Sequence, residues 1–408
     1  MSEDAYKKTR VAFYWSRILD TPFWAVFLML PYILLREFDG TPLQLSIMIA
    51  LKPLSSILSM YWSSIAGNRR SSLVSNVVWG GILRHLPFFF FPFIENSWMV
   101  VVAWGFHMVL LRGSQPAWME IFRINIPIVS REKVYAYGSA LGHVGDILLP
   151  LGIGYLLDGL PECWRWIFPL TALISLLPIF FQMRIPIEMN SEEESKLSIP
   201  IKEHIINPWK ETWKLLSERM DFTRFQIAFM FSGTALMIIQ PATIVFCANE
   251  LNLSYKDLSA ALIAFKGIGF ALTSPLWASW INKTNIYRFT SFVSMLICIF
   301  PVFVMVSKYN IAWLYLGYLG YGVMQAGSSL SWNMSGPIFA GNQNSSLFTT
   351  VNIVSVGLRG CVAPAFGGII CSYSGPVPVF ILGVVLSLIA TERLLSFSKA
   401  KKGSDLTI

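Results

Sequence analysis

The chain has 408 residues, of which 54% are hydrophobic and only 13% are charged, and its mean hydropathy is +0.57. Ordinary soluble domains carry about a quarter charged residues, so this composition excludes an ordinary soluble protein. The net charge of +8 does not indicate a nucleic-acid partner, because the basic residues concentrate between long apolar segments, as in membrane proteins.

About twelve apolar segments near the 20-residue length of a membrane-spanning helix follow one another along the chain. They are too long and too continuous for barrel strands, so only α-helices can satisfy their backbone in lipid. The polar run before the first segment shows no signal peptide. We therefore expect an all-α integral membrane protein in a lipid bilayer. The predicted spans cover residues 12–36, 45–66, 73–95, 98–121, 134–157, 164–184, 224–248, 258–281, 288–306, 311–334, 345–371 and 375–397.

The distribution of basic residues predicts the orientation of the chain. If both termini lie on one side, 21 of the 31 lysines and arginines fall on that side and four on the other. Positive residues concentrate in cytoplasmic loops, so we expect both termini in the cytoplasm, with the protein in a bacterial inner membrane. The five cysteines show no spacing typical of a metal site or a disulfide framework, and no cofactor is expected.

The two halves of the chain repeat at a constant offset of 214 residues. The matches relate spans one, two, four and five to spans seven, eight, ten and eleven. A register kept over this distance predicts a parallel duplication of six spans. The matched pairs include Thr9 with Thr223, Lys52 with Lys266, Gly113 with Gly327, Ser114 with Ser328, Trp118 with Trp332 and Pro150 with Pro364.

This repeat predicts four regions along the chain. Six-helix bundles occupy residues 1–184 and 223–398, a polar linker covers residues 185–222, and residues 399–408 form a cytoplasmic tail. The linker is predicted to hold one helix that runs to about Met220.

The start of the linker helix is predicted at Asn207, as the N-cap, with Pro208 in the first turn. Trp209, Trp213, Leu216 and Met220 then share a face. This pattern fits a helix lying on the inner leaflet, and it fits equally well a helix packed on the cytoplasmic face of the protein. These residues lie within IKEHIINPWKETWKLLSERM, residues 201–220.

Twelve spans in two repeats of the same orientation, with cytoplasmic termini and a long central loop, resemble the major facilitator superfamily over essentially the whole chain. The resemblance implies alternating access, in which two bundles rock about a central cavity lined by spans one, four, seven and ten. The loops AGNRRSSL at residues 66–73 and INKTNIYR at residues 281–288 depart from the family pattern because neither contains the usual aspartate.

The glycine-proline motif of antiporting members is only approximated in the fifth span, by GDILLPLGIG at residues 145–154. A closer match, GCVAPAFGG at residues 360–368, lies in the other half. Uptake or exchange is therefore favoured over drug antiport.

Charged side chains inside the predicted spans are mainly cationic. An ionised side chain at the bilayer centre costs about 2.5 to 3.5 kcal/mol, and the few embedded carboxylates cannot neutralise all of these cations. We therefore expect an electropositive cavity that binds a small organic anion bearing a carboxylate or phosphate. The cations are Arg17, Lys52, Arg84, Arg112, Lys266 and Arg359, and the carboxylates are Asp20 and Asp146, with Glu120 near a span end.

The fourth span carries the main candidate for substrate binding. Helical spacing places Arg112 and Gln115 on one face. Arg112 can donate a planar fork to a carboxylate or phosphate, and Gln115 can add a hydrogen bond. Gly113 and Ser114 lie beside this face and suit close helix packing, and a packing role is favoured for His107. In the second half, the candidate binding residues are the amides Gln240, Gln325 and Asn333.

Arg17, a further candidate for binding substrate, lies three residues from Asp20 on the first span and can instead pair with it locally. For Arg84 a structural role is favoured. Asp20 is the candidate carboxylate for proton coupling.

The family resemblance implies two further contacts between spans. Spans five and eight meet, so Asp146 can pair with Lys266. Spans two and eleven meet, so Lys52 approaches Arg359 with like charge, and such a pair repels unless an anion lies between. This pair is a second candidate for binding substrate.

We interpret the chain as a secondary transporter that moves a small organic anion by proton-coupled uptake (a symporter) or by exchange. The alternatives are an efflux antiporter and a receptor-like member that transports nothing. An enzyme is not expected, because the four histidines are scattered and no glycine-rich phosphate loop precedes a helix. The expected partners of the monomer are its small-molecule substrate, protons or a counter-anion, and the bilayer.

Overall fold

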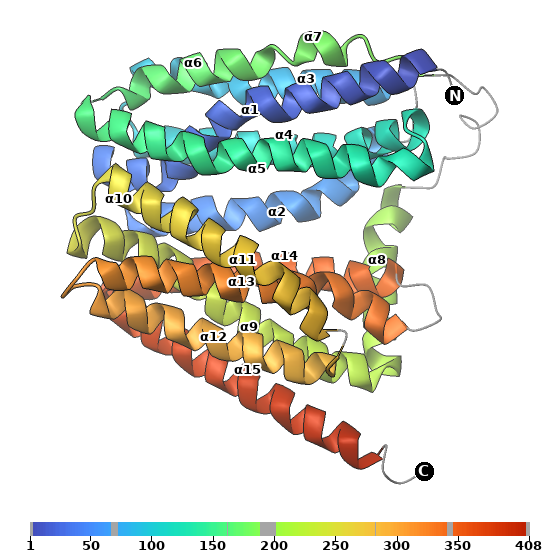
Figure 1. The fold of residues 1–408 in the computed structure, drawn as a ribbon, viewed down its shortest axis with the longest axis vertical. Helices are drawn as coiled ribbons and strands as arrows, with labels where there is room; N and C mark the ends of the chain where they lie inside the picture. The colour runs from blue at the N-terminus through green and yellow to red at the C-terminus, as the bar shows by residue number, and fades with distance from the viewer. Residues whose placement is uncertain are drawn as a thin grey trace. The chain divides into compact units, whose positions relative to one another are not determined.

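In the computed structural model every predicted span is helical (Figure 1). The structure describes residues 3–66, 72–160, 162–187, 201–281, 283–340 and 346–404. In the first half the helices are α1 (Glu3–Glu37), α2 (Pro42–Ala66), α3 (Leu73–His85) with the 3₁₀ helix η2 (Leu86–Phe93), α4 (Ser97–Asn125), α5 (Ile128–Gly159), α6 (Trp164–Leu176) and α7 (Ile179–Gln182).

The second half contains the corresponding helices and two π-helical turns. They are α9 (Met220–Val245) with η3 (Phe246–Glu250), α10 (Tyr255–Ser259), η4 (Ala260–Phe265), α11 (Lys266–Ile281), α12 (Ile286–Val306), α13 (Ala312–Ala340), α14 (Ser346–Ser374) and α15 (Pro376–Ser404). Helix α8 (Ile201–Glu218) lies between the halves in sequence.

Eight helical segments within the described residues are long and apolar enough to cross a membrane. The helices at the four other predicted spans, α2, α4, α5 and α13, are 25 to 32 residues long. These lengths exceed the roughly 20 residues that a bilayer requires. The predicted all-α membrane architecture is thus confirmed, and the described residues form no strand.

The helices group into two compact units. Unit 1 comprises Met1–Gly40, Leu54–Ile205 and Ser254–Ser259, and unit 2 comprises Thr41–Pro53, Ile206–Leu253 and Ala260–Ile408. The first part of α2 therefore packs with unit 2, and α10 packs with unit 1. The four sequence regions proposed above remain a prediction.

Helices α3 and α4 of unit 1 approach each other closely at a pair of small residues. A Cβ atom added to Gly80 would lie 3.0 Å from the Ser114 Cβ, and Ser114 is buried. The packing role predicted for Ser114 is confirmed, because a larger side chain at either position would separate the two helices.

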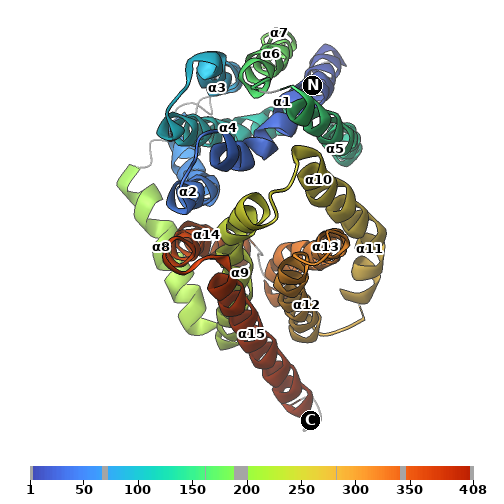
Figure 2. The ribbon, with the colours of Figure 1, turned by 90° about the vertical axis from the view of Figure 1, so that its left-hand side faces the viewer.

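In unit 2, α9 packs against α14 and α15, and α11 packs against α13, as the views in Figure 1 and Figure 2 agree. The crossing of α11 and α13 depends on glycine. A Cβ atom on Gly269 would collide with the Leu319 carbonyl, and one on Gly322 would collide with the Lys266 carbonyl. Backbone therefore meets backbone at this crossing.

Helix α8 begins at Ile201, six residues before the predicted start, so the prediction that Asn207 caps it is wrong. The preceding run, residues 201–206, contains no helix breaker, and the helix forms through it. Leu215 packs with Phe222 and Phe348 at the ends of α9 and α14, and Figure 1 shows α8 running across these ends.

Candidate functional site

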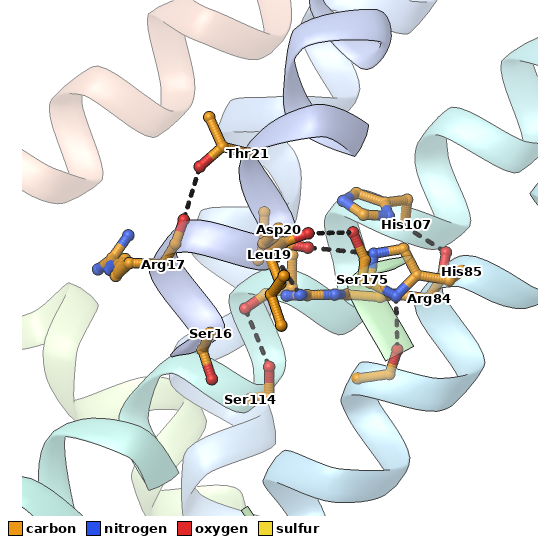
Figure 3. Close-up of polar contacts among 12 residues, drawn as sticks. Ser16, Arg17, Leu19, Asp20, Thr21, Arg84, His85, His107, Ser114 and Ser175 are labelled. Carbon is orange, nitrogen blue, oxygen red and sulfur yellow. Dashed lines mark hydrogen bonds and ion pairs between the residues drawn. The ribbon is translucent and has the colours of Figure 1, made fainter. Parts of the chain in front are cut away.

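A buried cluster of ionisable side chains joins α1 to α3 in unit 1 (Figure 3). The Asp20 Oδ2 accepts a hydrogen bond from the Arg84 Nη2 at 3.0 Å, and the Asp20 Oδ1 lies 3.3 Å from the His85 Nε2. Only 28% of the Asp20 side chain and 15% of the Arg84 side chain are exposed, and His85 is fully buried. The α6 residue Ser175 donates to the Leu19 carbonyl beside this cluster, at 3.3 Å.

The surroundings of His85 determine where its hydrogen atoms lie. Its Nδ1 lies 2.8 Å from the Gly81 carbonyl oxygen, which can only accept, so Nδ1 carries a hydrogen. In a neutral imidazole Nε2 then presents a lone pair to the Asp20 carboxylate. Neither the Asp20 Oδ1 nor the His85 Nε2 has a hydrogen-bond partner in the described structure. One additional proton between these two atoms satisfies both.

His107 adds a second buried imidazole from α4. Its Nδ1 donates to the Arg84 carbonyl at 3.1 Å, and Pro87, three residues after Arg84, has no N–H to offer that carbonyl. The ring packs against Phe23 and Phe27, with centroids 5.1 and 4.5 Å away. The packing role predicted for His107 is confirmed, and its hydrogen bond fixes the carbonyl next to the ion pair.

The alternative of a local pair between Arg17 and Asp20 is wrong. The Arg17 guanidinium lies over the Phe13 ring, 5.1 Å from its centroid, and Figure 3 shows it pointing away from Asp20. The Asp20 carboxylate turns toward α3, where Arg84 and His85 contact it. Sequence patterns held no signal for this arrangement, because Gly80 and Gly81, which precede the basic pair, face Ser114 of α4 and Ile179 of α7 rather than α1.

Arg112 and Gln115 lie together on α4 as predicted, with 3.4 Å between the Arg112 Nη1 and the Gln115 Oε1. The Arg112 Nε is buried and has no hydrogen-bond partner in the described structure. No described carboxylate forms an ion pair with Arg112, so its guanidinium keeps donors for another group. Its role in binding substrate remains a prediction.

Arg359 on α14 is a buried cation in unit 2, with only 8% of its surface exposed. Its Nη1 donates to the Phe229 carbonyl at 2.7 Å, and the guanidinium lies 4.7 Å from the centroid of the Phe229 ring. Gly233 makes room for it, because a Cβ atom there would overlap the guanidinium. The Arg359 Nε has no partner, and no described carboxylate pairs with this side chain.

The predicted meeting of spans two and eleven is confirmed within unit 2. A Cβ atom on Gly360 would lie 2.6 Å from Pro53, the residue after Lys52. Lys52 is exposed, in contrast to the buried Arg359. An anion between these two cations remains a prediction.

Lys266 on α11 and Gln240 on α9 are both half-buried in unit 2. The Lys266 Nζ lies 5.8 Å from the centroid of the Tyr321 ring of α13. Among the described residues no carboxylate pairs with Lys266. The side chain of Asp146, its predicted partner, lies outside the described residues.

The other predicted amides lie on α13. Asn333 donates to the Ser329 carbonyl at 2.8 Å and is exposed, and Gln325 is half-buried. A polar pair that the sequence did not suggest, Gln226 and Asn352, is buried and hydrogen-bonded in unit 2. No charge or repeated motif marks these two residues, so sequence patterns gave no signal for them.

One family model and several solved structures match the chain. The model of the Major Facilitator Superfamily matches residues 18–358. No curated protein matches the chain. Among solved structures, a peptide transporter in complex with sulfate is similar at 14% identity, with a TM-score of 0.69, covering 97% of this chain and 95% of that chain.

Two further solved structures share the fold. A mutant of the nucleoside transporter NupG aligns at 11% identity with a TM-score of 0.68, covering 95% of this chain and 98% of that chain. A bacterial homologue of the human lysosomal transporter Spinster, in an inward-facing and unoccupied conformation, aligns at 14% identity with a TM-score of 0.60. The alignment covers 98% of this chain and 96% of that chain.

Proposed function

The chain belongs to the Major Facilitator Superfamily, and from this premise we propose that it is a secondary transporter that moves a small organic anion together with a proton. The anion carries a carboxylate or a phosphate. The protein lies in a bacterial cytoplasmic membrane with both termini inside. Alternating access links binding on one side of the membrane to release on the other.

The observation that carries the proposal is the contact between Asp20 and His85. Arg84 already neutralises the Asp20 carboxylate, and the hydrogen on the His85 Nδ1 is held by the Gly81 carbonyl. The Asp20 Oδ1 and the His85 Nε2 can therefore share one proton, and neither atom has another hydrogen-bond partner in the described structure. A carboxylate and an imidazole at membrane depth suit a proton that is bound and released in each cycle.

The cations without carboxylate partners support an anionic substrate. Arg112 in unit 1 and Arg359 and Lys266 in unit 2 form no ion pair with a described carboxylate. Arg359 is buried and the other two are half-buried; a cation withdrawn from water is costly without a countercharge, and an anionic substrate lowers that cost while it is bound. Arg112 with Gln115 offers the planar donor fork that a carboxylate or phosphate requires.

In unit 1, electrostatic attraction couples binding of the proton at the Asp20 cluster to binding of the anionic substrate. Without the extra proton, Asp20, Arg84 and the two neutral imidazoles carry no net charge, and with it they carry one positive charge. The protonated cluster therefore raises the affinity of the same unit for an anion. By linkage, a bound anion raises the proton affinity of the cluster by the same factor. Proton and anion then move in the same direction.

Exchange of one anion for another is the second candidate. The cations without a described carboxylate partner favour it, because a carrier whose embedded cations lack a countercharge reorients poorly when empty. In that case the proton on the Asp20 cluster would stay bound throughout the cycle.

The test is uptake of radiolabelled carboxylates and phosphate esters by proteoliposomes. We expect an inward proton gradient to drive accumulation of at least one such anion above its external concentration. Accumulation that does not depend on the proton gradient, but requires an anion preloaded inside the proteoliposomes, would establish exchange instead. If no anion shows saturable flux, the proposed function is wrong.

A further inference from the structure

Helix α8 presents an aromatic and basic surface outward from unit 2. Trp209 is 42% exposed and Trp213 is 76% exposed, and Lys210 and Lys214 are exposed beside them. Together with Ser217 these residues line a shallow, open hollow of about 540 Å³. We call these five residues the Trp–Lys face.

The opposite side of α8 is fixed by packing. Leu215 and Thr212 are each 8% exposed, and Leu215 belongs to a cluster with Phe222 and Phe348. Leu216, at the border between this side and the tryptophans, is partly buried against the same cluster. Because α8 is anchored through this side, the Trp–Lys face cannot turn inward without breaking the cluster.

The cluster that anchors α8 defines its depth in the membrane. Its members lie at the beginnings of α9, α12 and α14 and at the ends of α13 and α15. Successive spans alternate in direction, so these termini share one side of the membrane. Figure 1 shows α8 running across helix ends rather than along a span. The Trp–Lys face therefore lies at the level of the lipid headgroups on this side.

The chemistry of the face fits an anionic phospholipid. Indole rings favour the interface, where an apolar body meets a polar edge. Lys210 and Lys214 are four residues apart and lie on neighbouring turns. Lys214 pairs loosely with Glu218 at 3.9 Å, whereas Lys210 has no described carboxylate partner. The ammonium groups thus complement a phosphate, and the indoles complement the glycerol and upper acyl region.

We propose that the Trp–Lys face of α8 binds the headgroup of an anionic phospholipid of the cytoplasmic leaflet. Lys210 and Lys214 contact the phosphate, and Trp209 and Trp213 flank the glycerol. The site is independent of the transported solute.

Native mass spectrometry of the full chain with phosphatidylglycerol or phosphatidylcholine tests this proposal. We expect the Lys210→Gln/Lys214→Gln variant to retain phosphatidylglycerol about tenfold less than the unmodified protein. Phosphatidylcholine retention should stay unchanged. The matched control is Lys283→Gln/Lys399→Gln, which removes two exposed lysines outside the face.

Three outcomes would overturn the proposal. Equal loss in the control variant would show that only net charge matters. Unchanged retention in the Lys210→Gln/Lys214→Gln variant would remove the face as a lipid site. Displacement of the lipid by millimolar inorganic phosphate would assign the site to a free anion.

A second variant tests the aromatic part of the face. Trp213→Ala removes a side chain that is 76% exposed, so we expect the fold to persist while phosphatidylglycerol retention falls severalfold. Trp166→Ala, at a tryptophan that is 68% exposed in unit 1, is the control. If both variants lose lipid equally, the Trp–Lys face is not a specific site.

Discussion

At the scale of single residues, the central finding is that Asp20 has two basic partners from α3. Arg84 holds one carboxylate oxygen at 3.0 Å, and His85 faces the other at 3.3 Å. These contacts separate two roles. Arg84 supplies a permanent charge, because a guanidinium does not lose its proton in proteins. His85 and Asp20 together form the position at which a proton can bind and be released.

We therefore expect Asp20→Asn to abolish accumulation driven by a proton gradient. The amide has nearly the same shape and can still accept a hydrogen bond from Arg84, but it leaves the Arg84 charge uncompensated, so stability should fall. The folded fraction, purified by gel filtration, should still exchange radiolabelled for unlabelled substrate. Asp39→Asn, at an exposed loop carboxylate with a positive φ that Asn tolerates, is the control. Normal gradient-driven uptake by Asp20→Asn would remove Asp20 from coupling.

Arg112 provides a second prediction at this scale. Arg112→Gln should raise the KM for an anionic substrate at least tenfold, because the planar donor fork is lost. Arg112→Lys should recover only part of the affinity, since a point charge replaces a bidentate donor. The measurement is concentration-dependent uptake in proteoliposomes with matched protein content. An unchanged KM in both variants would exclude Arg112 from the substrate site.

At the scale of helices, glycine determines how closely neighbouring elements approach. On α13, Gly322 faces the Lys266 carbonyl of α11, whereas Gly320 has nothing within 4 Å of an added Cβ atom. The two glycines share a helix and differ only in what they face.

Gly322→Ala should therefore lower the free energy of unfolding by about 1–3 kcal/mol through overpacking. Gly320→Ala should leave it unchanged or raise it by up to about 1 kcal/mol through helix propensity. Thermal unfolding in detergent, followed by fluorescence, compares the two variants. Equal melting temperatures would show that α11 and α13 do not cross at Gly322.

At the scale of the whole molecule, the orientation in the membrane follows from the distribution of charge. Cys163 provides a native probe of it, because it lies between α5 and α6, in a loop predicted to be outside, and is a free thiol of intermediate exposure. Burial raises the pKa of the Cys163 thiol, so less thiolate is present at neutral pH and the labelling rate should increase as the pH rises.

We expect a membrane-impermeant maleimide to label Cys163 in right-side-out vesicles and to leave it unlabelled in sealed inside-out vesicles. Cys163→Ser should remove the signal, which controls for the other four cysteines. Mass spectrometry of the labelled peptide gives the readout. Labelling only in inside-out vesicles would reverse the proposed orientation.

The sequence by itself determined the twelve helical segments, the membrane environment, the family and the shared face of Arg112 and Gln115. These features are local, since hydropathy and helical spacing are read along one segment. It also predicted that Ser114 packs closely, because small residues recur at the same place in both halves.

The tertiary structure alone decided which charges meet. Asp20 and Arg84 are 64 residues apart, and their pairing depends on the rotation of α1 and α3 about their axes and on the relative heights of the helices. Spacing along one helix allowed a pair of Asp20 with Arg17, whose side chain points elsewhere. The position of Arg359 against Gly233 and that of Lys266 near the Tyr321 ring likewise depend on contacts between helices, which no periodicity within a helix encodes.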